Sequence, residues 1–134
     1  MNKVLIMLIA LVMSILISCA SQPKLVKAYV EPEQASPGDL IKMYAQFTGS
    51  AKDLKAVYLT VREYPSEYPR IDLYPGTGDD QNLWSEDGEI PWEASPGMYH
   101  LDVNAIKKDG EEIVSEGFEN NWAGKAGTIV LQIK

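Results

Sequence analysis

The sequence predicts an all-β domain, an antiparallel sandwich of about seven or eight strands that begins near residue 25. Two observations support this fold class. Short β-branched or alternating runs recur between turns rich in Pro, Gly and Asp, and almost nothing after Pro23 has the period of a helix. The expected strands cover 25–31, 40–48, 55–63, 70–74, 81–84, 97–107, 112–118 and 128–133.

Three of the expected strands alternate apolar and polar residues, which predicts one buried and one wet face in each. His100, Asp102 and Asn104 are expected on the wet face of the strand at 97–107. The predicted core residues are Ile41, Met43, Ala45 and Phe47, then Val57, Leu59 and Val61, and finally Tyr99, Leu101, Val103 and Ala105.

The tetrapeptide Ala-Ser-Pro-Gly occurs at 35–38 and again at 94–97, each time just before one of these alternating strands. Pro fixes φ at the second position of a turn, and Gly accepts the positive φ of a type II turn at the third. We therefore expect two similar corners that lead into two core strands.

The first 18 residues have the composition of an export leader rather than of a folded domain. Lys3 gives a positive start, and the run from Val4 to Ile17 is apolar apart from Ser14. Its 14 residues reach about 21 Å as a helix, which is short of the ~30 Å hydrocarbon core of a bilayer. We therefore expect a signal peptide rather than a permanent transmembrane helix.

The tetrapeptide Leu16-Ile17-Ser18-Cys19 resembles the lipobox of bacterial lipoproteins. That resemblance implies cleavage after Ser18 and attachment of a diacylglycerol to the Cys19 thiol, with acylation of the new amine in addition. Cys19 is the only cysteine in the chain, so no internal disulfide competes for it. The alternative is a secreted protein with an incidental cysteine near its cleavage site.

The expected organisation is a signal peptide over 1–18, a lipidated N-terminus and tether over 19–24, and one domain over 25–134. Lipidation places the protein in the cell envelope. Ala20 follows the cysteine in place of the Asp associated with inner-membrane retention, so in a Gram-negative cell we expect the outer membrane, facing the periplasm or the surface.

Two segments of the domain resemble bacterial immunoglobulin-like domains. Residues 36–39, Ser-Pro-Gly-Asp, are similar to the entry to their second strand. Residues 96–105, followed by Lys-Asp-Gly at 108–110, are similar to their penultimate strand and its turn, a pattern shared with fibronectin type III modules. The resemblance covers roughly 25–118 and implies that Tyr99 is a tyrosine-corner residue, its hydroxyl bonded to nearby backbone.

Composition and residue types argue against several kinds of chemistry. The net charge is −7, with 19 Asp and Glu against 12 Lys and Arg, so contacts with a phosphate backbone and hence with nucleic acid are not expected. His100 is the only histidine and lies mid-strand, without a serine in a nucleophile setting. One histidine and an acylated cysteine do not make a zinc site. We assign no catalytic residue and do not expect an enzyme.

An acidic segment at 72–93 holds seven Asp and Glu and no Lys or Arg. Calcium takes six to eight oxygen ligands, which a flexible acidic loop can provide. The candidate ligands are Asp79, Asp80, Asp87 and Glu89. The spacing does not match the Asp-x-Asp-x-Asp-Gly loop, and an ordinary solvated acidic loop is the alternative.

Trp84, Trp92 and Trp122 all lie in or beside expected loops. Aromatic platforms flanked by acids stack sugars or hold protein partners, so these three are candidate binding residues. We expect Trp84 and Trp92 to pack at the edge of the sandwich and Trp122 to be the most exposed of the three.

The sequence thus predicts a non-enzymatic envelope lipoprotein, held to the membrane by the lipid on Cys19, whose immunoglobulin-like domain mediates protein interaction or assembly. One alternative is a carbohydrate- or peptidoglycan-binding module that uses Trp122 and the loop at 74–92. Another is an inhibitor or accessory subunit of an envelope enzyme that inserts an acidic loop into a basic cleft. The expected partners are therefore the membrane and an envelope protein or glycan.

Overall fold

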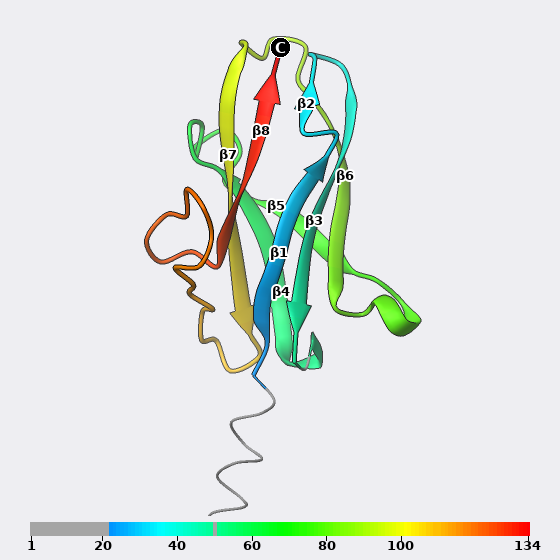
Figure 1. Ribbon diagram of the computed structural model, residues 1–134, viewed down its shortest axis with the longest axis vertical. Coiled ribbons are helices and arrows are strands. Elements are labelled where there is room, and N and C mark those ends of the chain that lie inside the picture. The colour runs from blue at the N-terminus through cyan, green and yellow to red at the C-terminus, as the bar shows by residue number, and fades with distance from the viewer. Residues whose placement is uncertain (1–21, 50) are drawn as a thin grey trace, which may run out of the picture.

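The computed structural model describes residues 22–49 and 51–134, and there the chain is all-β (Figure 1). The predicted signal peptide and Cys19 lie outside the described residues. The strands are β1 (Lys24–Glu31), β2 (Gln34–Ala35), β3 (Leu40–Thr48), β4 (Leu54–Val61), β5 (Ile71–Pro75), β6 (Leu83–Glu89), β7 (Gly97–Lys107) and β8 (Gly127–Ile133). Two short 3-10 helices, η1 (Ala51–Asp53) and η2 (Gly78–Asp80), lie between strands.

The strands form one sheet in the order β1-β3-β6-β5-β4-β7-β8-β2. β2 pairs with β8 in parallel, whereas the other neighbours are antiparallel. The predicted all-β class is confirmed, but the sheet is mixed rather than purely antiparallel.

The sheet curls until it is nearly closed into a barrel. β5 joins its two halves, because 71–73 pair with β4 while Tyr74 and Pro75 pair with β6. At the other side, β1 and β8 contact each other although they are not neighbours in the hydrogen-bonded order (Figure 1). The core fills the space inside this curled sheet.

Two strand predictions need correction. Residues 112–118 form no strand and contribute a single bridge between Glu112 and Ile106. The backbone of Ser115 bonds instead to a neighbouring loop, its N–H to the carbonyl of Lys125 and its carbonyl to the side chain of Asn121. β6 runs on to Glu89 rather than ending at 84, because its acidic second half pairs with β3.

The predicted core residues are buried. Val57, Leu59 and Val103 are the least exposed of the large ones, and Tyr99 is half-buried at the margin. The predicted wet face of β7 fails at Asp102, whose residue exposure is only 1%. β8 completes the core with Ile129, Leu131 and Ile133.

The first Ala-Ser-Pro-Gly corner is the expected type II turn. Gly38 has a φ of +87°, and the N–H of Asp39 donates to the carbonyl of Ser36 at 3.0 Å. At the second corner Gly97 has a φ of +154° and starts β7, so that corner has a different geometry. The hydroxyl of Tyr99 donates to the carbonyl of Ser95 at 2.7 Å, which confirms the backbone bond expected of this tyrosine.

Candidate functional site

An open groove of about 490 Å³ lies between the β4–β5 connection and the end of β6. Its floor is apolar and reaches the core at Ile41, Met43 and Leu101. Tyr64 and Tyr68 of the β4–β5 connection form part of its wall. This volume falls within the range of ligand pockets, roughly 300–1,000 Å³.

The groove exists because β5 leaves β6 early. β5 pairs with β6 only at Trp84 and Ser85, so the remainder of β6 has β3 on one side and no strand on the other. Gly88 adds to the hollow, since a Cβ atom at this position would lie 3.1 Å from Cε of Met43, over the groove floor.

The hydrogen-bond pattern shows which peptide groups face the groove. The N–H of Ile90 donates to Asp39 O and the N–H of Phe47 donates to Asn82 O, so even-numbered residues bond toward β3. Odd-numbered residues of β6 point to the other side. The peptide groups of Asp87 and Glu89 therefore lie along the free edge of β6.

One N–H group along the free edge of β6 is hydrogen-bonded to a neighbouring side chain. The N–H of Asp87 donates to the carboxylate of its neighbour Glu86 at 2.8 Å. That carboxylate occupies a position where a carbonyl of an added strand would otherwise accept the bond.

The groove carries negative charge. Four of its lining residues are acidic, Glu67, Asp87, Glu89 and Glu93, and the lining residues drawn from the described chain include no Lys, Arg or His. Negative charges gathered around a low-dielectric hollow concentrate the electrostatic field there and attract cations.

Tyr99 holds one wall of the groove in place. Its ring stacks on that of Tyr64 with a centroid separation of 6.0 Å, and its hydroxyl is bonded to Ser95. Burial raises the pKa of Tyr99, and the nearby Tyr64 raises it further.

The three tryptophans occupy different environments. Trp84 is buried as expected, with its Nε1 unpaired among the described atoms. Trp92 is 76% exposed and Trp122 50%, so the expectation that Trp122 is the most exposed is wrong. Trp92 lies beside the groove rim with its ring against Gly38, where a Cβ atom would come within 2.4 Å of the ring. Together with Leu40, also 76% exposed, Trp92 forms an apolar tip.

The groove and the apolar tip lie at the end of the sheet that is remote from the start of β1. Glu31 at the end of β1 pairs with Lys42, and Leu40 at the start of β3 pairs with Glu89. Figure 1 shows the start of β1 at the bottom and the ends of β6 and β8 at the top.

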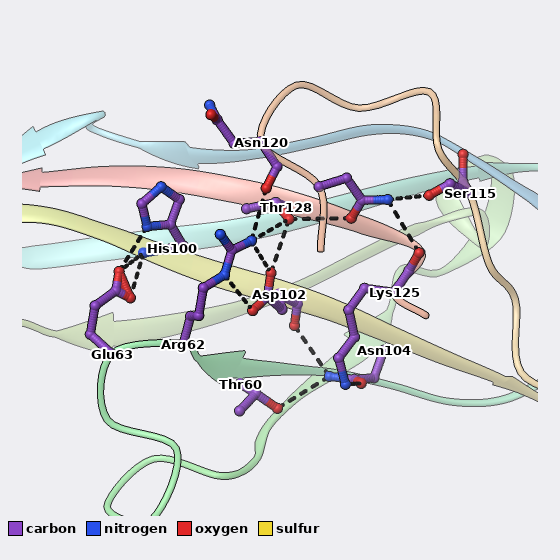
Figure 2. A network of polar contacts seen from close by, with 11 residues as sticks. Thr60, Arg62, Glu63, His100, Asp102, Asn104, Ser115, Asn120, Lys125 and Thr128 are labelled. Carbon is purple, nitrogen blue, oxygen red and sulfur yellow. Dashed lines mark hydrogen bonds and ion pairs between the residues drawn. The ribbon is translucent and has the colours of Figure 1, made fainter. Parts of the chain in front are cut away.

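A second polar feature lies on the outer face of β4, β7 and β8, where Figure 2 shows a network centred on Arg62 and Asp102. Arg62 Nε and Nη2 donate to the two carboxylate oxygens of Asp102 at 3.0 and 2.7 Å. Thr128 Oγ1 donates to the same carboxylate at 3.0 Å, and Arg62 also donates to Asn120 O at 2.8 Å. The hydrogen bond that Arg62 donates to Asp102 is the main cause of the raised pKa of Arg62.

This network fastens the long β7–β8 connection to the sheet. The side-chain amide of Asn121 donates to the carbonyls of Ser115 and Lys125, and Lys125 Nζ donates to Asn104 Oδ1 at 2.6 Å (Figure 2). Trp122 covers the guanidinium of Arg62, whose Cζ is 5.0 Å from the ring centroid. The ring of Trp122 therefore covers the partly buried ion pair of Arg62 and Asp102.

The calcium candidates are not gathered into one site. Asp79 and Asp80 lie on η2, whereas Asp87 and Glu89 lie on β6. Across 22–49 and 51–134, the structure places no three Asp, Glu, His or Cys side chains as a metal-binding group. Sequence reasoning singled out Asp87 and Glu89, as calcium ligands, but missed Glu67, which comes to the groove from the β4–β5 connection.

His100 lies on the outer face of β7 beside Glu63. Its Nδ1 is 2.8 Å from Glu63 Oε1, and its backbone N–H donates to the same carboxylate (Figure 2).

In the described part of the chain, no helix is both long and apolar enough to span a bilayer.

No protein-family model matches the sequence, and no curated protein sequence matches it. Among solved structures, the chain is similar to the Pseudomonas fluorescens alkylpurine DNA glycosylase AlkC bound to DNA containing an abasic site analog, with a TM-score of 0.53 and 14% identity. That match covers 85% of this chain and 31% of the glycosylase. The chain is also similar to a GspB Siglec domain, with a TM-score of 0.51 and 15% identity over 85% of this chain and 59% of that one. It spans less than two thirds of either structure, and at these identities the likeness concerns the fold alone.

Proposed function

We propose that this chain is a non-enzymatic, lipid-anchored envelope lipoprotein whose immunoglobulin-like domain binds another protein. The observation that carries the proposal is the open groove of about 490 Å³, with its apolar floor, its acidic lining and its free strand edge. An apolar hollow beside a strand edge that no other strand pairs with is the combination that protein partners use for affinity and register.

The immunoglobulin-like sandwich is the finer part of this proposal. In favour of it, β1, β3 and β6 follow one another in one half of the sheet, and β4, β7, β8 and β2 in the other. β5 divides its pairing between the halves, and β1 and β2 lie at opposite edges. The bond from Tyr99 to the backbone of Ser95 fits a tyrosine corner.

The position of the groove suits an anchored protein. With Cys19 lipidated, the five residues at 19–23 reach at most about 18 Å before β1 starts at Lys24. The groove lies at the other end of the sheet, so the partner would be met on the side away from the bilayer.

The glycan-binding alternative loses two of its supports. Trp84 is buried, and Trp122 directs its ring at Arg62 rather than leaving a bare stacking platform. The acidic-loop inhibitor remains a special case of protein binding, in which the partner is an envelope enzyme.

Site-specific photo-crosslinking in cells tests the proposal. A benzophenone amino acid replaces Tyr68, which is 38% exposed in the groove wall, or Tyr74, which is 59% exposed on β5 and outside the groove. We expect a discrete crosslinked envelope protein from position 68 and none from position 74. Equal yields at the two positions, or no adduct at position 68, would rule out the groove as the partner site.

A further inference from the structure

We infer that the groove takes an extended segment of its partner that adds as a strand to the free edge of β6, with an apolar residue between two Lys or Arg residues. The inference rests on the proposed function and specifies the chemistry of the partner. It follows from the direction of the peptide groups, the alternation of side chains and the charge around the groove.

The backbone of β6 offers the bonds that an added strand needs, once a carbonyl of that strand replaces the Glu86 carboxylate at the N–H of Asp87. Asp87 and Glu89 are two residues apart, which is the spacing at which one edge of a strand presents successive donor and acceptor sets. β5 supplies strand pairing to β6 only as far as Ser85. The added segment would therefore continue the sheet from the point where β5 turns away, between β6 and the wall formed by Tyr64 and Tyr68.

The side chains of β6 then fix the pattern of the partner. Directly opposed residues on neighbouring strands share one face of the sheet, and successive residues alternate between faces. The residues opposite Asp87 and Glu89 would lie beside two carboxylates on the outer face. The residue between them would lie opposite Gly88 and enter the hollow above Met43 and Ile41. A basic, apolar, basic alternation satisfies all three positions.

The charge of the groove also argues against pairing of β6 with the β6 of a second copy. Pairing β6 with another β6 would bring Asp87 and Glu89 of one copy against the same acids of the other. Like charges placed opposite each other across strands are destabilising. A cationic partner relieves the repulsion among the four carboxylates instead.

Two variants of Glu89 separate the backbone contribution from the charge. Glu89→Pro removes the N–H that faces the groove and leaves the bonds toward β3, because only even-numbered residues of β6 make those bonds. Glu89→Gln removes the same charge and keeps the N–H. Matching melting temperatures of the two variants establish that both are folded.

The test selects binders to the full chain, purified in mild detergent, from a displayed library of random octapeptides. We expect enriched peptides in which Lys or Arg alternates with an apolar residue. Glu89→Pro should weaken the binding of these peptides at least about tenfold, because it removes a backbone hydrogen bond and displaces the added strand. Glu89→Gln should weaken it only about two- to threefold at low salt, because it removes one exposed charge. Amide exchange at Asp87 and Glu89 should slow when the peptide binds.

Three results would overturn the inference: no enrichment of basic–apolar peptides, equal binding by Glu89→Pro and Glu89→Gln, or unchanged exchange at Asp87 and Glu89 in the complex. None of these affects the crosslink expected from position 68. A failed strand addition is therefore distinguishable from a failed protein-interaction function.

Discussion

Asp102 shows how strongly one residue can depart from the pattern of its strand. It alternates with Leu101 and Val103 as a wet-face residue should, yet it is 1% exposed. The sequence pattern could not predict this, because the residues that bond to Asp102 lie just after β4 and on β8. Arg62, 40 positions earlier, supplies two hydrogen bonds, and Thr128 supplies a third.

Replacing Asp102 with Asn should lower the free energy of unfolding by about 3 kcal/mol, because a charged partner of the buried pair is lost while Arg62 stays partly buried. Urea unfolding followed by tryptophan fluorescence measures the change. The matched control is Asp72→Asn, which removes the exposed pair of Arg70 and Asp72, also 2.7 Å apart. That variant should lose no more than about 1 kcal/mol. Equal losses would contradict the role assigned to the network.

The stability that Tyr99 contributes to the folded state should depend on pH. Its pKa is raised in the folded state, so its contribution is complete below the unfolded pKa of about 10 and is lost as pH rises through the folded pKa. Tyr99→Phe should cost about 1 kcal/mol at pH 8 through the lost bond to Ser95. The difference between the two proteins should shrink above pH 10, measured by urea unfolding at both values. A difference that grows with pH would reverse the sign of this argument.

β6 is the strand whose observed length departs from the length expected from its sequence. The run Glu86-Asp87-Gly88-Glu89 has the composition of a loop, and a strand was expected to stop before it. Pairing with β3 overrides that composition, with Lys42 directly opposite Asp87. Two of the calcium candidates, Asp87 and Glu89, thereby lie on a strand edge beside the groove, whereas Asp79 and Asp80 lie on η2.

Gly88 gives a prediction at the scale of this element. Gly88→Val should fold normally, because the added Cβ meets only the flexible end of Met43 and valine suits a strand. The new side chain fills part of the hollow, so the crosslink from position 68 should fall about tenfold, in line with a loss of roughly 1.4 kcal/mol of binding. Gly88→Ala is the matched control and should have a smaller effect. A full crosslink yield in the valine variant would show that the partner does not enter the hollow.

At the scale of the whole molecule, the fold class and most of the strands could be predicted from the sequence. Alternation is a local property, so the buried sets on β3, β4 and β7 follow from short stretches such as 40–47. The groove could not be predicted in this way. It arises where β5 departs from β6, and Glu67 and Tyr68 reach it from a connection whose path depends on the closed sheet. The surroundings of Trp92 could not be predicted for the same reason. Its ring lies against Gly38, which belongs to a corner more than 50 residues earlier in the chain.

The lipid anchor gives the prediction for the whole molecule. Cys19→Ser should move the protein from the membrane fraction to the soluble or secreted fraction, because no acyl chain can be attached and each buried CH₂ contributes about 0.8 kcal/mol to membrane binding. Ultracentrifugation and immunoblotting measure the distribution, and the unfolding curve of the variant should match that of the parent domain. A Cys19→Ser protein that is still processed normally and sediments with membranes would exclude the anchor.

The opposite placement of the groove and the start of β1 also has a mechanical consequence. A partner held at the end of β6 and a lipid that holds Cys19 would pull on the domain from its two ends, along the strands. β1 would be drawn against β3, to which it is paired from Lys24 to Glu31. Because the hydrogen bonds of an antiparallel pair run across the strands, this load shears the whole ladder at once instead of opening it bond by bond. If Cys19 is lipidated and a partner occupies the groove, the domain would carry the tension between them through this ladder.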